Sequence, residues 1–183
     1  MCLSEKYFCD RLWAASLYEH TKNESLIHDL VTRLKFSGEE SIVPKLFEGD
    51  VSYLGLPPVS DEHRYDLILP LPLSLKRLRE RGYNQSWLLA QKIADILKTP
   101  ANPWMLEKVR DTKPQTLVSV EERRQHLRGA FVISKKHEKS IGGKSVLLVD
   151  DVYTTGSTME EAAKILKRAG AVSVEGWVLA RAD

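Results

Sequence analysis

The fold of this chain is decided by residues 146–158, which read VLLVDDVYTTGST. The apolar start of this stretch predicts a buried strand over Ser145 to Val149. Two acidic residues follow, and then a short turn of hydroxyl-bearing residues and glycine. An amphipathic helix is predicted directly after the turn, from Ser157 to Ala169. This order is typical of the carboxyl edge of an open parallel sheet, where ligands bind.

The side chains of this stretch favour a ribose and a phosphate as ligands. Asp150 and Asp151 can accept hydrogen bonds from two vicinal ribose hydroxyls, and a Mg²⁺ held mainly by a diphosphate would fit beside them. The first turn of the helix offers unpaired N–H groups to a phosphate, which Gly156 would let approach without a Cβ in the way. Further hydroxyl donors are Thr154, Thr155, Ser157 and Thr158. The alternative is that the acids merely end a turn and that Thr154 and Ser157 cap the helix.

The rest of the chain predicts strands that alternate with helices. Helices are predicted over residues 24–36, 39–47, 85–97 and 121–127, and strands over 65–69, 104–109, 129–133 and 173–179. The alternation predicts an α/β fold with a parallel twisted sheet flanked by helices on both faces. We expect Trp87 and Trp177 in its core.

Positive charge is concentrated in the central third of the chain. Residues 67–139 carry 15 Lys and Arg against 7 Asp and Glu, whereas residues 1–66 carry 7 against 12. An anionic partner, whether a diphosphate or a nucleic-acid backbone, would therefore bind the central third.

A basic loop is predicted immediately after the strand at residues 65–69. Arg77 and Arg81 suit bidentate contacts with diphosphate oxygens, whereas Lys76 and Arg79 could face solvent. The alternative is a solvated charged surface without a ligand. For single-stranded DNA, the candidate contacts are Arg79, Arg81 and the ring of Tyr83, which lies among the arginines.

Several motifs, in this order, resemble the ComF-type (ComFC) competence proteins. They are LKFSG at 34–38, PLPL at 70–73, RLRERGYNQ at 77–85, RDTKPQ at 110–115, Arg123, GAF at 129–131 and the stretch at 146–158. The resemblance covers residues 24–181 and implies a type I phosphoribosyltransferase fold with a small N-terminal appendage. It implies that Asp150 and Asp151 contact the ribose of phosphoribosyl diphosphate (PRPP), and that Thr154 to Thr158 cradle its 5′-phosphate.

The same resemblance assigns the diphosphate to the loop after an early strand. The residues concerned are Pro70, Leu71, Pro72 and Arg77, and Arg81 joins the two acids as a catalytic candidate. At residue 126 the family usually has Asn where this chain has His126.

The N-terminal residues 1–23 are predicted to be an appendage to a domain over residues 24–183. The family often begins with a four-cysteine zinc module, of which this chain has only Cys2 and Cys9. Either zinc is absent or residues 1–23 are the remnant of a shortened module, and a reduced pair of thiols is the simpler interpretation.

Three functions remain open from the sequence. The chain could be a phosphoribosyltransferase acting on an unknown base, with PRPP and Mg²⁺. It could act in DNA uptake and natural transformation, with contacts to single-stranded DNA and to other competence proteins. It could also sense PRPP without turnover. No apolar run is long enough to span a membrane and no signal peptide is recognisable, so we expect a cytoplasmic protein.

Overall fold

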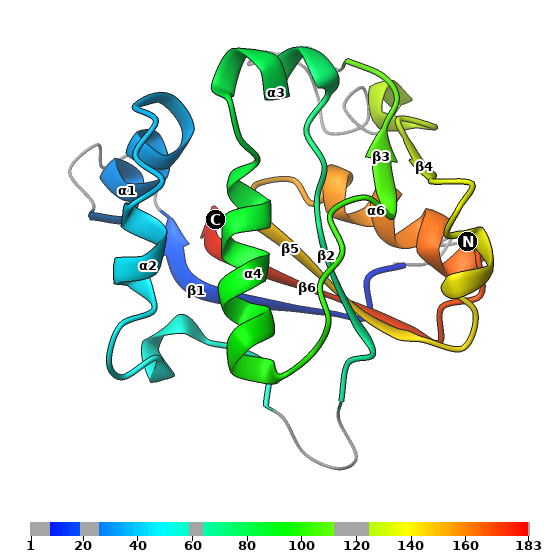
Figure 1. Ribbon diagram of the computed structural model, residues 1–183, viewed down its shortest axis with the longest axis horizontal. Coiled ribbons are helices and arrows are strands. Elements are labelled where there is room, and N and C mark those ends of the chain that lie inside the picture. The colour runs from blue at the N-terminus through cyan, green and yellow to red at the C-terminus, as the bar shows by residue number, and fades with distance from the viewer. Residues whose placement is uncertain (1–7, 19–25, 59–63, 112–124, 183) are drawn as a thin grey trace, which may run out of the picture.

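The computed structural model describes residues 8–18, 26–58, 64–111 and 125–182. Its centre is a four-stranded parallel sheet in the order β1-β6-β5-β2 (Figure 1). The strands are β1 (Arg11–Tyr18), β2 (Leu67–Pro70), β5 (Ser145–Tyr153) and β6 (Ser173–Ala182). The parallel sheet predicted from the alternating pattern is confirmed.

The apolar run of β5 explains why both faces of the sheet are covered. Successive side chains of a strand point to opposite faces, so an unbroken apolar run needs a core on each side. Val146 and Leu148 belong to one core cluster, and Leu147 and Val149 to the other. All four side chains are fully buried.

The two cores are closed by different elements. One face of the sheet carries α1 (Leu26–Phe36), α2 (Ile42–Leu46) and α4 (Gln85–Leu97). The other carries α6 (Ser157–Arg168) and a small antiparallel pair of strands, β3 (Leu106–Lys108) and β4 (Phe131–Ile133). Two short 3₁₀ turns, η1 (Ser52–Leu54) and η2 (Glu138–Ser140), also occur, and residues 125–127 are helical. No described helix is long and apolar enough to cross a membrane.

Helix α4 begins and ends where its sequence predicts. The side chain of Asn84 accepts a hydrogen bond from the backbone N–H of Ser86 and so caps the first turn. Lys98 ends the helix in the left-handed conformation, with φ of 53°. Trp87 on this helix is half-buried, whereas Trp177 on β6 is fully buried.

The basic segment predicted as a loop is instead a short helix, α3 (Leu75–Arg81). The hydroxyl of Ser74 accepts a hydrogen bond from the Arg77 N–H at its start, and Gly82, with φ of 88°, ends it. None of its residues is buried. A helix without a buried face needs no apolar periodicity, and apolar periodicity is the pattern by which helices are predicted.

One further prediction, on strand pairing, needs correction. The strands predicted at 104–109 and 129–133 exist, but they pair with each other and not with the parallel sheet. Residues 11–18, assigned to the N-terminal appendage, form β1 at the edge of the main sheet, paired with β6. The predicted boundary between residues 23 and 24 lies outside the described residues.

Candidate functional site

Three of the predicted site segments meet at the carboxyl end of the sheet. Strand β5 carries the acidic pair close to its carboxyl end, continues through Tyr153 and leads through residues 154–156 to helix α6. Its neighbour β2 ends at Pro70, and the Leu71 N–H donates to the carbonyl of Val149 at 2.8 Å. The Asn84 side-chain amide donates to the carbonyl of Leu71 at 3.0 Å, which fixes the 70–72 turn to the start of α4. The acids therefore lie beside the turn predicted to hold a diphosphate.

Asp150 is held by a serine that the sequence did not single out. The Ser86 hydroxyl, on the first turn of α4, donates to Asp150 Oδ1 at 2.8 Å. Burial, and after it the charge of Asp151, raise the pKa of Asp150 to about 7, although the Ser86 hydrogen bond and the charge of Lys35 act to lower it. Near neutral pH this carboxyl can therefore hold a proton or release it.

Asp151 is more deeply buried and less well satisfied. Its exposed fraction is 3%, and within the described residues its Oδ2 atom has no hydrogen-bond partner. The ammonium of Lys35, at the end of α1, lies 3.1 Å from that oxygen. This contact is an ion pair without hydrogen-bond geometry, so a ligand that donates to this oxygen would replace Lys35 there.

Basic groups surround the acids from α3 and β3. Arg81 donates to Gln85 Oε1, and its pKa is lowered mainly by burial, while the nearby charges of Asp151 and Asp150 act in the opposite direction. The pKa of Lys108 on β3 is also lowered, first by burial and then by the charge of Arg77. Positive charges that lie this close to one another form a site suited to an anion with several charges.

The predicted phosphate loop contains Thr154, which is exposed, and Thr158, which is half-buried. The hydroxyls of Thr155 and Ser157 lie 3.0 Å apart at the start of α6. Gly156 has φ of 73° and precedes the first helical residue. A Cβ on Gly156 would lie 2.2 Å from the hydroxyl of Tyr153, so it is a tyrosine ring that the glycine accommodates in this structure.

The residues predicted to contact DNA differ in their exposure to solvent. Arg79 is exposed on α3, whereas the Tyr83 hydroxyl donates to the carbonyl of Leu34 at 2.6 Å and its ring is half-buried. Phe36, at the end of α1, is 78% exposed, and the Arg81 guanidinium lies 5.8 Å from the centre of its ring. The exposed ring nearest the arginines is thus Phe36, which the sequence analysis did not select.

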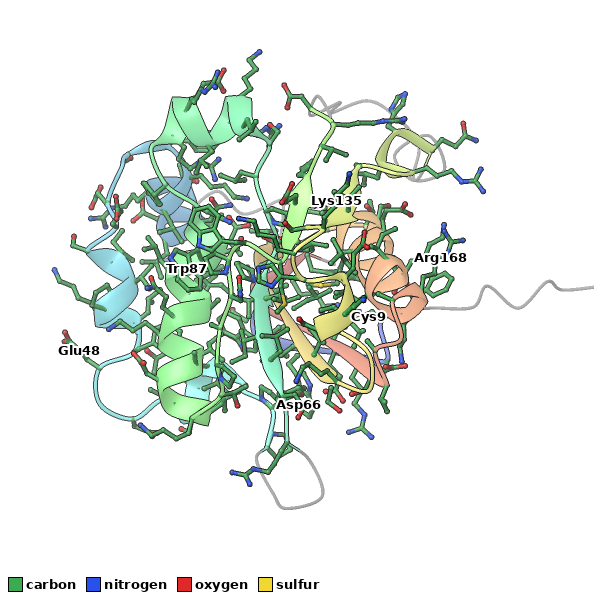
Figure 2. The ribbon with its side chains drawn as sticks, turned by 45° about the vertical axis from the view of Figure 1, so that its right-hand side comes forward. Cys9, Glu48, Asp66, Trp87, Lys135 and Arg168 are labelled. Carbon is green, nitrogen blue, oxygen red and sulfur yellow. The ribbon has the colours of Figure 1, made fainter. Side chains whose placement is uncertain are left out.

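A cavity of about 290 Å³ lies away from the acidic pair. It is lined by Arg64, Tyr65 and Asp66 before β2 and by residues 97–100 after α4. Figure 2 shows Asp66 at the bottom of the molecule, and in Figure 1 strand β2 runs upward from there toward α3. This cavity is at the amino end of β2, opposite the site.

Comparison with known proteins shows the family to which the chain belongs. The phosphoribosyl transferase domain family matches residues 84–182. Competence protein F of Haemophilus influenzae is 35% identical over 156 residues, which are 84% of this chain and 67% of that protein. The chain belongs to the ComF family. Its fold is that of the type I phosphoribosyltransferases, as the sequence predicted.

Other ComF-family relatives are more distant or match a shorter stretch. Competence protein ComFC of Bacillus subtilis is 29% identical over 163 residues, 88% of this chain and 62% of its own. The DNA utilization protein YhgH of Escherichia coli K12 is 37% identical over 116 residues, 63% of this chain and 49% of its own. The chain thus spans between about half and two thirds of these relatives.

Two solved structures of enzymes that act in phosphoribosyl chemistry contain a chain similar to this one. The purine phosphoribosyltransferase of Pyrococcus horikoshii has a TM-score of 0.41 at 17% identity, covering 92% of this chain and 89% of its own. The glutamine phosphoribosylpyrophosphate amidotransferase of B. subtilis has a TM-score of 0.45 at 20% identity, covering 78% of this chain and 26% of its own.

The predicted zinc candidates of this ComF-family chain are only partly described. Cys2 lies outside the described residues. Burial raises the pKa of the Cys9 thiol to about 12, and its Sγ lies 3.1 Å from the carbonyl of Arg11. No group of three or more His, Cys, Asp or Glu that could hold a metal ion occurs among the described residues.

The family motif at 110–115 and Arg123 are mostly outside the described residues. Within the described part, Asp111 accepts a hydrogen bond from the Ser74 hydroxyl at 2.7 Å and so fixes the end of β3 to the start of α3. His126 is exposed.

Proposed function

We propose that this ComF-family chain binds PRPP together with Mg²⁺ at the carboxyl end of β5. The observation that carries the proposal is the buried Asp151 carboxylate, whose Oδ2 lacks a hydrogen-bond donor among the described residues. A pair of ribose hydroxyls would supply donors to Asp150 and Asp151. The hydroxyls of Thr155 and Ser157 at the start of α6 would receive the 5′-phosphate.

The donor set fits Mg²⁺ that is held mainly by the ligand. Carboxylate oxygens are the protein ligands that Mg²⁺ accepts, and it commonly takes one or two of them together with phosphate oxygens. Asp150 and Asp151 provide that number, and the described residues provide no larger cluster. When bound, the ion would neutralise charge on a departing diphosphate.

The cations of α3 and β3 would hold the diphosphate itself. Arg81 on α3 and Lys108 on β3 both interact electrostatically with Asp150 and with Arg77, although they come from two separate segments of the chain. In a transferase, Arg81 and the two acids would stabilise the charges that develop at the ribose and at the diphosphate. The Asp150 carboxyl, with its pKa near 7, could take a proton from an acceptor base.

Ligand-induced stabilisation tests this proposal directly. PRPP with Mg²⁺ should raise the unfolding temperature of the protein, since a ligand at 100 times its Kd stabilises the fold by about 2.7 kcal/mol. The Asp150→Asn/Asp151→Asn variant should lose this shift, and the exposed-site control Asp95→Asn should keep it. No shift in the unaltered protein, or an equal shift in the double variant, would exclude a PRPP site here.

We also propose that the chain acts in DNA uptake through contacts with single-stranded DNA. The names of its relatives refer to competence and DNA utilization. The exposed Arg79 and the Arg81–Phe36 pair offer phosphate contacts and a ring for base stacking on adjacent elements.

Salt-dependent binding of a labelled oligonucleotide would test the DNA contact. Arg79→Ala/Arg81→Ala should reduce the slope of log K against log salt by about 1.4, because each phosphate contact to a single strand contributes about 0.7. The control Lys135→Ala/Lys136→Ala removes two exposed charges beyond β4 and should leave the slope nearly unchanged. Binding that is absent, or insensitive to salt, argues against DNA contact.

Turnover is a separate measurement. Diphosphate release from PRPP over a panel of bases, with and without single-stranded DNA, distinguishes a transferase from a protein that binds PRPP without reaction. Release that depends on one base, and disappears in Asp150→Asn/Asp151→Asn, identifies the transferase. PRPP binding without release identifies the sensor.

A further inference from the structure

The first helix contributes a cation to the acidic pair. Lys35 is the penultimate residue of α1, and its Nζ lies 3.1 Å from Asp151 Oδ2. The charge of Lys35 also acts to lower the pKa of Asp150. Helix α1 is far from β5 in sequence, and no motif of the phosphate loop includes it.

A buried carboxylate needs such a partner in the ligand-free protein. Removing a carboxylate from water is costly unless an opposite charge or hydrogen bonds replace the solvent. Asp150 has the Ser86 hydroxyl, but Asp151 Oδ2 has no hydrogen-bond donor among the residues that the structure describes. The Lys35 ammonium thus lies at the oxygen that a ligand would use.

The exposure of the two side chains allows Lys35 to leave its ion pair with Asp151. The lysine side chain is 25% exposed, whereas that of Asp151 is 4% exposed. An ammonium on a flexible four-carbon stem can therefore turn to water while the carboxylate stays in place.

The body of α1 is independently fixed and need not move. Leu34 is fully buried, and its carbonyl accepts the hydrogen bond from the Tyr83 hydroxyl. Arg33 forms an ion pair with Glu39, at 2.5 Å, beyond the end of the helix. A change at Lys35 is thus confined to the side chain and its immediate neighbour, Phe36.

We propose that Lys35 is an internal cation that occupies Asp151 in the free protein and competes there with the divalent metal ion. This inference rests on the proposed function, because it assigns a competitor to the same carboxylate. Lys35 is a positioning residue in this scheme: it keeps the acid in place until metal and ligand arrive, and its ammonium then turns to solvent.

Metal binding without PRPP tests the competition. Mn²⁺ replaces Mg²⁺ as the probe, and electron paramagnetic resonance counts the free ion at pH 8. Lys35→Met should bind Mn²⁺ about tenfold or more tightly than the unaltered protein, because a unit positive charge within a few ångströms of the metal is removed. Lys35→Met/Asp151→Asn should lose this gain.

A matched control lies on the same helix. Arg33→Met removes the ion pair with Glu39 but no charge beside Asp151, so its affinity for Mn²⁺ should equal that of the unaltered protein. Equal or weaker binding in Lys35→Met would overturn the inference. If PRPP gives no thermal shift while Lys35→Met gains metal affinity, the PRPP proposal fails and the competition stands.

A second measurement needs no substitution and covers a variant that does not fold. Acylation of lysines in the unaltered protein, followed by mass spectrometry, reports which amines are free. Saturating Mn²⁺ should raise modification of Lys35 several-fold relative to the exposed Lys45 on α2. An unchanged ratio would contradict release of Lys35 by the metal.

Discussion

Replacement of Gly156 by alanine would measure how closely Tyr153 packs on the turn before α6. The glycine has φ of +73°, and an added Cβ would lie 2.2 Å from the Tyr153 hydroxyl and 2.5 Å from its Cζ. Gly49 provides a matched control, since its φ is +74° and nothing lies within 4 Å of its added Cβ. Both variants place alanine in the left-handed region, but only Gly156→Ala displaces a ring.

The expected loss of unfolding free energy has two sources, the left-handed backbone conformation and the clash with the tyrosine ring. The left-handed conformation costs a non-glycine residue about 1–2 kcal/mol, which is the whole expected loss for Gly49→Ala. Overpacking against a neighbour adds about 1–3 kcal/mol, so Gly156→Ala should lose about 2–5 kcal/mol in total. Tyr153 packs against the core on the α6 side of the sheet, so its ring cannot move without losing that contact.

Urea unfolding of Gly156→Ala and Gly49→Ala, each with and without Tyr153→Ala, would separate the cost of the backbone conformation from the cost of the clash. Tyr153→Ala should remove most of the extra loss at Gly156 and leave the loss at Gly49 unchanged. If Gly156→Ala is no more destabilising than Gly49→Ala, or if the extra loss persists without the tyrosine ring, the packing argument is refuted.

Two further predictions concern pH and a buried hydrogen bond. The pKa of Asp150 rises from 3.8 to about 7 on folding, so the folded chain binds the extra proton between these values and stability falls as pH rises through this window. Asp150→Asn should flatten that fall in urea unfolding at pH 5 and pH 8, and an unchanged pH dependence would contradict the assignment. Tyr65→Phe removes the hydroxyl that donates to buried Glu175 Oε2 at 2.7 Å and should cost about 1–3 kcal/mol. Tyr53→Phe, at an exposed hydroxyl, should cost less than about 0.5 kcal/mol, and equal losses at the two positions would count against the buried bond.

The sequence was most informative where local chemistry and burial agree. Residues 146–158 predicted a strand, an acidic pair and a helix start because an apolar run, two charges and a glycine-containing turn each have a strong local preference. The predicted bounds of helix α4 agree with the structure at both ends, because Asn84 caps the helix and its apolar residues keep helical spacing. These local signals sufficed for the parallel α/β fold and for the family.

The contacts across the site could not be predicted in the same way. The acids interact with three residues from other elements, Lys35 of α1, Ser86 of α4 and Lys108 of β3. The local sequence around a lysine or a serine does not indicate which distant carboxylate it will contact. The helix at Leu75–Arg81 was missed because it buries no residue.

The pairing of β1 with β6 also sets the order in which the protein can be completed during synthesis. Trp13 on β1 donates its indole N–H to Glu175 on β6, 162 positions later in the chain. A ribosome releases β1 long before β6, so β1 must wait as an unpaired strand while the segment between them is made. The sheet edge beside β6 closes only after the acidic pair and helix α6 have already emerged, and until then β1 is exposed to chaperones and to pairing with other chains.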